Sequence, residues 1–350
     1  MKSNYEPLGK HIRLVDYRNS EEVTSTVLGI SIDKEFMPSV ANVIGTDLSR
    51  YKLISKGLFA CNPMHVGRDE RLPIALYEKD NAAIVSPAYF MFEIIDRDVL
   101  NEEYLMMWFR RPEFDRECWF MTDGSVRGGI SWDDLCRIQL PVPPYERQLD
   151  VVESYRAITR RIAMKKEIND NLEAVLAASH SKMFFSKDTS EHSKLGELMT
   201  FGNGKSRPKT DGPIPVYGGN GVLSYTNHHN IENAVLIGRV GAYCGSVYLE
   251  QGICWVSDNA IFAKSKITKD EFFDYFLLKR LNLFNHHVGT GQQLLTQEIL
   301  NNIEVPKPVT EQIELFNRKA TSIFETIFTN SREIIRLQEL SDLLLSRLAG

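Results

Sequence analysis

The feature that most constrains the fold of this chain is an internal repeat. The run from Ile138 to Glu146 and the run from Ile303 to Glu311 share two prolines, flanking apolar residues and a final glutamate, and they lie 165 positions apart. The same separation persists through the residues that follow, where apolar or small side chains recur in pairs: Ile158 and Ile323, Ile162 and Ile327, Leu172 and Leu337, Val175 and Leu340, Ser181 and Ser346, Met183 and Leu348. A register kept over about 45 residues indicates a duplication.

A second similarity lies near the start of each copy, where the run from Leu8 to Leu14 resembles the run from Leu195 to Phe201 at a separation of 187. The copies therefore begin and end alike but differ by 22 residues of interior. Each copy is expected to hold one globular domain followed by one long helix. The expected boundaries of the domains and helices are 1–145, 146–190, 191–310 and 311–350.

Both expected helices carry the apolar pattern of a coiled coil. No glycine or proline occurs from Glu146 to Phe184, and apolar residues recur at alternating spacings of four and three. The pattern favours antiparallel pairing of the two helices within the chain as a rigid spacer, and the alternative is that each helix only caps its own domain. Polar residues, which fix register and orientation in coiled coils, interrupt this seam at Lys165, Asn169, Asn330 and Ser341.

The globular segments have the pattern of mixed α/β domains. Short apolar runs alternate with glycine- and proline-rich loops, as in residues 26–32, 83–87 and 89–95 of the first segment. A helix is predicted over 101–109, with a counterpart at 269–278. The predicted fold class is therefore mixed α/β, with two similar domains separated by two long antiparallel coiled-coil helices.

The composition indicates a soluble cytoplasmic protein. No run of eighteen apolar residues occurs, and the N-terminal residues lack the apolar stretch of a signal peptide. The five cysteines are odd in number and include no Cys-x-x-Cys, which predicts free thiols rather than disulfides or a zinc site. The net charge of −5 argues against a broadly basic nucleic-acid binder, so any DNA affinity must come from local clusters such as Lys205, Arg207 and Lys209.

The motifs of several enzyme classes are missing. The Gly-Lys-Ser run at 204–206 imitates the end of a phosphate-binding loop, but Met199 stands where that loop needs its first glycine. Neither Asp-x-Lys nor Glu-x-Lys, the pattern of common metal-dependent nucleases, occurs, and the Val-Pro-Pro-Tyr run at 142–145 lacks the asparagine of an amino-methyltransferase motif. The histidine pairs at 228–229 and 286–287 have no ligand at metal spacing, which favours surface or DNA-facing roles. The residues therefore predict no catalytic chemistry and no cofactor or metal in this chain.

Several short stretches are characteristic in combination: Leu135 to Gln148, Ile299 to Gln312, Pro215 to Gly221, Leu236 to Gly241, Trp255 to Ala260 and Leu343 to Ala349. In this order, over nearly the whole length, the chain resembles the specificity subunits of type I restriction-modification systems. The stretches 59–63 and 85–89 resemble those of another subtype of recognition domain.

The resemblance implies two target-recognition domains, 1–145 and 191–310, which each read one half of a split, asymmetric site in double-stranded DNA. It implies that the helices set the distance between the half-sites and dock two methyltransferase subunits, and that restriction (translocase) subunits join that core. S-adenosylmethionine, ATP and Mg²⁺ would then belong to the partners of a non-catalytic chain. The alternatives are an orphan or regulatory methyltransferase-binding scaffold that reads no sequence, and a stand-alone DNA methylase or nuclease, which the missing motifs disfavour.

The candidate DNA-binding residues lie in or near glycine-rich loops. Arginine, lysine, asparagine and glutamine distinguish base edges, and glycines let the backbone approach a phosphate closely. The candidates of the second domain are Lys205, Arg207, Asn220, Arg239, Gln292 and Gln293, and those of the first are Asn62, Arg68 and Arg127. An equally favoured interpretation makes Asn62 a turn residue only.

Overall fold

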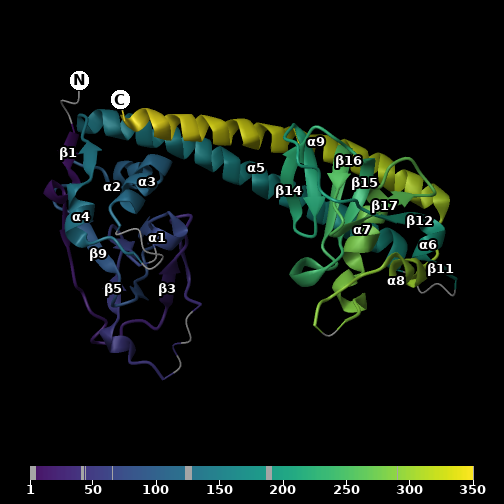
Figure 1. Cartoon of the computed structure of the whole chain (residues 1–350), viewed down its shortest axis with the longest axis horizontal. Coiled ribbons are helices and arrows are strands. Elements are labelled where there is room, and N and C mark those ends of the chain that lie inside the picture. Colours follow the sequence, from purple (N-terminus) through teal and green to yellow (C-terminus); the bar gives the residue numbers. More distant parts are fainter. Residues whose placement is uncertain are drawn as a thin grey trace. The chain divides into compact units, whose positions relative to one another are not determined.

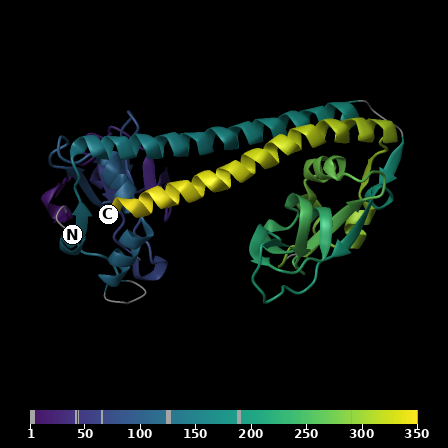
Figure 2. The same cartoon turned by 90° about the horizontal axis from the view of Figure 1, so that it is seen from above.

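The computed structural model describes residues 5–40, 43, 45–64, 66–122, 128–186, 191–289 and 291–349. The chain forms two compact units, one of residues 1–164 with 334–350 and one of residues 165–333. Two long helices, α5 (Tyr145–Phe185) and α9 (Thr310–Ser346), contribute to both units and lie side by side in both views (Figure 1, Figure 2). Each unit has a core of its own, built from one globular segment and parts of both helices.

The first unit contains two four-stranded sheets. The sheet with strand order β2-β9-β6-β7 is antiparallel, and the sheet with order β4-β3-β8-β5 includes the parallel pair β3 and β8. The rings of Phe59, Phe92 and Phe109 join the first sheet to α2, with centroids 5.1 to 6.3 Å apart. The element bounds are β2 Ile12–Leu14, β3 Val27–Ile30, β4 Phe36–Pro38, β5 Lys52–Ile54, β6 Phe59–Cys61, α1 Val66–Asp69, β7 Ile74–Leu76, β8 Ala83–Val85, β9 Phe90–Ile94, α2 Glu102–Phe109, α3 Pro112–Phe120 and α4 Trp132–Arg137.

The second unit contains one six-stranded sheet with strand order β12-β17-β15-β16-β13-β14. The neighbours β13 and β16 are parallel, and the other neighbouring pairs are antiparallel. Helix α7 is buried from Phe272 to Leu278, because the sheet and the long helices share one core with it. The bounds are α6 Leu195–Leu198, β12 Met199–Asn203, β13 Ile214–Gly218, β14 Gly221–Thr226, β15 Ile231–Gly238, β16 Val247–Val256, β17 Ala260–Ser265, α7 Phe272–Arg280 and α8 Gln297–Asn302.

The two units share a frame that closes each globular segment. In the first unit β1 (Tyr5–Pro7) pairs with β10 (Gln139–Pro141), and both strands are antiparallel. In the second unit β11 (His192–Lys194) pairs with β18 (Glu304–Pro306) in the same way. The first strands of the two pairs are 187 positions apart and the second strands are 165 apart, which are the separations of the sequence repeat.

Hydrogen bonds beside these strands also repeat. Leu8 N donates to Ile138 O at 2.8 Å, and Leu195 N donates to Ile303 O at 2.9 Å. The duplicated sequence therefore encodes the frame, whereas the sheets inside the frame differ between the units. The predicted class is confirmed: the fold is mixed α/β, with two long helices and a repeated frame.

Each core includes a helix that belongs to the other copy of the repeat. In the first unit Val152 of α5 is buried with Leu345 of α9 and with Leu348, just after that helix, and in the second Leu176 of α5 is buried with Phe316 of α9. Residue numbers rise along one helix as they fall along the other, so the helices are antiparallel, as predicted. The alternative in which each helix only caps its own domain is wrong.

A buried amide on α5 holds the start of α2 in the first unit. Gln148 is fully buried. Its Oε1 accepts a hydrogen bond from Asn101 N, and its Nε2 donates to Val99 O and Pro143 O, each at 2.9 Å. The side chain thus satisfies three backbone groups that would otherwise be buried without partners.

A buried amide on α9 has the same role at α7 in the second unit. Asn317 is 2% exposed. Its Oδ1 accepts from Phe273 N at 2.9 Å, and its Nδ2 donates to Asp270 O at 3.0 Å and to Thr268 Oγ1 at 2.9 Å. Buried amides of both long helices therefore add polar bonds to the apolar packing that holds the globular segments, Gln148 of α5 in the first unit and Asn317 of α9 in the second.

Gln148→Leu is expected to destabilise the first unit by about 2–4 kcal/mol, because leucine leaves the three backbone groups unsatisfied in the core. Urea unfolding followed by circular dichroism measures the loss. Gln338→Leu is the matched control, since Gln338 is an exposed glutamine on α9. Equal stability of both variants would contradict a role for the Gln148 amide.

Candidate nucleic-acid interface

One turn of the second unit holds several loops together. Residues 257–259 join β16 to β17, and the loops that follow β12, β13 and β15 lie against them. Three backbone hydrogen bonds hold these segments together. Lys205 N donates to Val256 O at 3.0 Å, Arg239 N donates to Asn259 O at 3.0 Å, and Ser257 N donates to Tyr217 O at 2.9 Å. The sheet therefore brings together segments that are far apart in the sequence. Turn 257–259 and the loops that follow β12, β13 and β15 are called the loop group.

The loop after β12 has a fixed backbone and exposed basic side chains. A Cβ atom at Gly204 would lie 2.0 Å from Ser257 O, so only glycine allows this close approach. The carbonyl of Lys205 accepts a hydrogen bond from Trp255 Nε1 at 3.4 Å. The side chains of Lys205 and Arg207 are both exposed. This loop offers two cations at the surface on an anchored backbone.

Asn220 lies in the short turn between β13 and β14, with its side chain exposed. Gly221 has φ +76°, a conformation that favours glycine. A Cβ atom on Gly219 would lie 3.6 Å from Asn259 O, which places this turn beside turn 257–259. Asn220 thus follows directly after a residue that lies beside turn 257–259, the centre of the loop group.

Arg239 is held by its backbone on both sides. Its carbonyl accepts from Leu295 N at 2.9 Å, in addition to the bond from its N–H to Asn259. The half-buried guanidinium has one long hydrogen bond, from Nη1 to Asp258 O at 3.4 Å, and its buried Nε has no partner in the described part of the chain. Because little of its donor capacity is used, the guanidinium is free to bind an external acceptor.

The two predicted glutamines lie in the loop before α8. Gln293 O accepts from Gly241 N at 3.0 Å, so this loop adjoins the one that follows Arg239. Gln292 is exposed beside it. The structure therefore brings the segments of Lys205, Asn220, Arg239 and Gln293 together, while Arg207 and Gln292 extend the same group at its edge.

Tyr243 is a surface residue of this group that the sequence analysis did not select. Its side chain is 50% exposed. Gly241 and Gly245 flank it with φ +71° and +84°, and a Cβ atom on Gly238 would lie 2.1 Å from Tyr243 O. An aromatic residue between two glycines after a strand was the sequence signal that could have identified it.

Two of the three candidates of the first unit, Asn62 and Arg68, have partners within the unit. Asn62 Oδ1 accepts from Met64 N at 3.2 Å, the geometry of a turn residue. Arg68 donates to both carboxylate oxygens of Asp69, from Nε at 2.7 Å and from Nη2 at 2.8 Å. Arg127 lies outside the described residues. The positions of Asn62 and Arg68 favour loop-shaping roles over direct base contacts.

The segment after Arg127 lies against the segment that contains Asn62 and Arg68. Gly67 N donates to Gly128 O at 3.0 Å, and Ile130 N donates to Pro63 O at 3.1 Å. Two loops that are distant in the sequence thus form one surface in the first unit.

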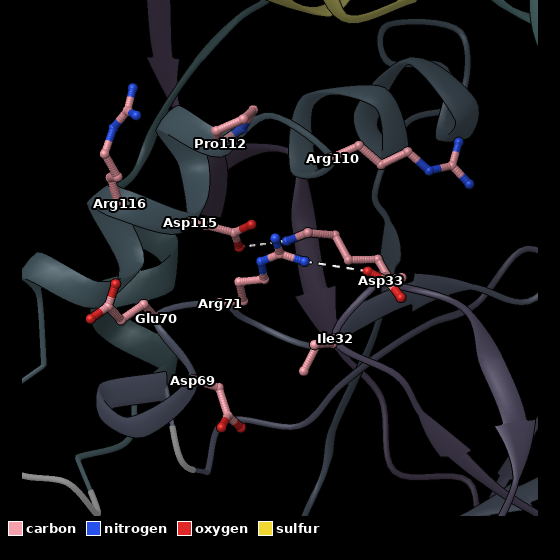
Figure 3. Close-up of a pocket in the computed structure, with 10 residues that line it drawn as sticks. Ile32, Asp33, Asp69, Glu70, Arg71, Arg110, Pro112, Asp115 and Arg116 are labelled. Atoms are coloured by element: carbon pink, nitrogen blue, oxygen red, sulfur yellow. Dashed lines mark hydrogen bonds and ion pairs between the residues drawn. The ribbon is translucent and has the colours of Figure 1, made fainter. Parts of the chain in front are cut away.

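A polar pocket of about 410 Å³ in the first unit has a balanced set of charges (Figure 3). Lys34 is 5% exposed and its Nζ donates to Asp115 Oδ1 at 2.6 Å, while burial lowers the pKa of its ammonium group. Arg71 Nη1 lies 3.3 Å from Asp33 Oδ1. The guanidinium groups of Arg110 and Arg116 point away from Asp115 (Figure 3). Its acidic and basic groups offset one another, so the pocket does not have the single sign of a phosphate site.

All five cysteines have free thiols. No group of three or more His, Cys, Asp or Glu side chains is placed to hold a metal ion in the ranges that the structure describes. None of the described helices is long and apolar enough to cross a membrane.

Residues 187–343 match the family model of the type I restriction modification DNA specificity domain. The crystal structure of a type I restriction-modification S subunit from M. genitalium is similar in fold, with a TM-score of 0.61 and 14% identity over 98% of this chain and 95% of that one. The HsdS subunit from Thermoanaerobacter tengcongensis matches with a TM-score of 0.40 and 17% identity over 98% and 95%. No curated protein sequence matches the chain.

Proposed function

We propose, from the premise that residues 187–343 form a type I restriction-modification DNA specificity domain, that this chain is the DNA-specificity subunit of such a system. The observation that carries the proposal is the loop group around turn 257–259, where Lys205 and Arg239 reach the surface from anchored backbones. The chain selects the DNA sequence and leaves catalysis to partner subunits.

The loop group suits direct reading of bases. An arginine fork matches the two acceptors of guanine in the major groove, and asparagine matches adenine, which gives roles to Arg239 and Asn220. Lys205 and Arg207 suit phosphates, which fix the position of the protein on the duplex. Because backbone bonds already hold Lys205 and Arg239, less conformational freedom is lost when DNA binds.

The repeated frame supports a site in two halves. In each unit the same antiparallel strand pair closes the globular segment, so each unit offers DNA one globular segment that is held in the same way. The interiors differ, with two four-stranded sheets in one unit and one six-stranded sheet in the other. The two units therefore read different half-sites, and the DNA site is bipartite and asymmetric.

Two grooves at equivalent positions support docking of two copies of one partner. The groove of the first unit measures about 910 Å³ and that of the second about 570 Å³. Both lie where a helix of the globular segment, α2 or α7, meets a long helix, and two lining positions on the long helices are equivalent in the repeat: Gln338 and Glu173, and Asp342 and Ala177. On the long helices these positions keep the separation of 165. Two methyltransferase subunits fit this arrangement, with restriction (translocase) subunits joining them and with S-adenosylmethionine, ATP and Mg²⁺ bound by the partners.

Base-resolved methylation sequencing tests the proposal. DNA is compared from cells that express the methyltransferase with this chain and from cells that express the methyltransferase alone. A methylated split motif that depends on the chain is the expected result, and it gives both half-sites at once. A complex that co-purifies but adds no methylated motif would contradict DNA reading and leave a methyltransferase-binding scaffold.

Inserting four residues into α5 between Lys166 and Glu167 is expected to change the permitted spacing of the half-sites or to abolish assembly. The insertion lengthens one helix by roughly 6 Å and rotates the seam by roughly 40°. Lys166→Ala with Glu167→Ala alters the same positions at unchanged length and is the control. The spacing is measured by methylation of a library with variable spacers. An intact complex with unchanged spacing would contradict a role for the helices as a ruler.

A further inference from the structure

Two equivalent residues of the repeat touch each other on the long helices. Lys165 Nζ donates to Asn330 Oδ1 at 2.9 Å, and these residues are 165 positions apart. In an antiparallel pair made from a repeat, equivalent residues meet only at the centre of the pair, because their numbers run in opposite directions. Lys165 and Asn330 therefore mark the pseudo-two-fold centre of the helix pair.

The centre is polar and mostly buried. Lys165 also contacts Glu333, with Nζ 2.8 Å from Oε2, and Asn330 Nδ2 donates to Asn169 Oδ1 at 2.9 Å. Asn330 is 8% exposed, and the side chain of Lys165 is 17% exposed. Lys165, Asn169, Asn330 and Glu333 are called the polar centre below. It joins a cation on one helix to an anion on the other.

The polar centre is a part of the seam where the two helices differ in charge. Several equivalent seam positions carry the same kind of apolar residue, as in Ile162 and Ile327, and these positions fit like and unlike helices equally well. Leu176 and its equivalent Ser341 differ, but neither carries a charge. At the polar centre two of the polar residues have apolar equivalents. The position equivalent to Asn169 is Ile334, and the position equivalent to Glu333 is Ile168.

We propose that the polar centre selects pairing between the two unlike helices and rejects pairing of the same helix from two copies of this chain. Two α5 helices would place two Lys165 side chains together, with isoleucine where Glu333 stands. Two α9 helices would bring two copies of Glu333 together without a lysine. A buried charge without its partner is costly, and a single polar seam position can set the partner of a coiled coil.

The duplication explains why such selection is needed. A chain that contains two nearly equivalent helices can form like pairs between molecules as readily as the unlike pair within one molecule, if the seam is only apolar. Polar residues that are satisfied in one arrangement alone disfavour the others. This inference concerns association of the chain with itself and holds whether or not the chain reads DNA.

Charge reversal in the full chain tests the unlike pair. Lys165→Glu is expected to lower the thermal unfolding midpoint by several degrees, because it places two carboxylates at the centre, and Glu333→Lys is expected to do the same with two ammonium groups. The double variant Lys165→Glu with Glu333→Lys should recover at least half of either loss. A double variant no better than the worse single variant would overturn the proposal.

Mixed refolding tests the rejection of like pairs. Two differently tagged batches are unfolded, mixed and refolded, and two-chain species carrying both tags are quantified by co-purification and light scattering. Replacing all four residues of the polar centre by leucine should raise the mixed-tag fraction at least tenfold over the wild-type chain. The charge-reversed double variant should match the wild type. A swapped dimer that keeps the unlike pairs would also carry both tags, so the wild-type fraction is the baseline.

A second neutral variant keeps the test decisive in case the leucine variant is insoluble. Lys165→Asn with Glu333→Gln removes both charges but keeps a polar seam, and its mixed-tag fraction should also exceed that of the wild type. Ser341→Leu is the control, since Ser341 is a buried seam residue outside the polar centre. Equal mixed-tag fractions in the wild type and in both neutral variants would overturn the proposal, and so would an equal rise with Ser341→Leu.

Discussion

Asp274→Asn is expected to stabilise the second unit, and by more at pH 8 than at pH 5. Asp274 lies on α7 with 1% of its surface exposed, and burial raises the pKa of its carboxyl group to about 7. Ser265 opposes this shift only in part, and no hydrogen bond of normal geometry reaches either carboxylate oxygen within the described residues. At pH values between 3.8 and about 7, the folded unit therefore holds a mostly protonated acid that the unfolded chain would ionise.

The direction of this pKa shift decides whether the stability of the second unit rises or falls with pH. A carboxyl group whose pKa is raised on folding stabilises the fold fully below its unfolded pKa of 3.8, and that stability is lost as the pH rises through about 7. Asparagine does not ionise, so the variant keeps the stability that the wild type loses. The difference of about three between the folded and unfolded pKa values corresponds to at most about 4 kcal/mol in the free energy of unfolding above pH 7. The corresponding difference at pH 5 is smaller.

Thermal unfolding midpoints at the two pH values measure this effect. The midpoint of Asp274→Asn should exceed that of the wild type by several degrees at pH 8, and the excess should shrink at pH 5. Asp270→Asn is the matched control, because Asp270 is an exposed aspartate just before the same helix. A gain that is equal at both pH values would mean that Asp274 is not protonated in the fold.

Arg239→Ala is expected to weaken recognition of one half-site by about 10- to 100-fold and to leave the other half-site unchanged. A bidentate arginine contact with a guanine contributes about 1–3 kcal/mol of discrimination. Arg239→Lys keeps the charge but loses the fork, so it should relax base preference more than it lowers overall affinity. Both effects follow from a guanidinium that has one long internal hydrogen bond.

Methylation of a library with single-base changes in each half-site, at one fixed salt concentration, measures both variants. Arg318→Ala is the control, since Arg318 is an exposed arginine on α9 outside the loop group. Uniform weakening over all sequences would assign Arg239 to a phosphate instead of a base. Unchanged methylation would remove it from the interface.

The duplication and the long helices could be predicted because their signals do not depend on which strands pair. Heptad spacing and the Pro-x-Pro runs near 141 and 306 can be recognised without knowing which strands pair. The helix expected at 101–109 is α2, and the one expected at 269–278 is α7 with a later start. Each pattern depends on residues within one turn or one heptad of each other.

The sheets and the loop group could not be predicted from such local signals. The parallel pairing of β13 with β16 joins segments about 40 residues apart, and no turn motif specifies it. Turn 257–259 became the centre of the site because three strands end beside it, a result of register. The pair of Arg68 with its neighbour Asp69 was visible in the sequence, and it lowers the value of Arg68 as a DNA contact.

The order in which the chain is made bears on the first unit. Its core includes Leu345 and Leu348, near the C-terminus, together with residues from the N-terminus such as Leu8. During synthesis, residues 1–164 leave the ribosome long before residues 334–349 exist, so the apolar surface that α9 covers stays open meanwhile. The second unit is continuous from 165 to 333 and can close earlier. The unit that is synthesised first is thus completed last, and a nascent or prematurely terminated chain exposes an unfinished N-terminal core.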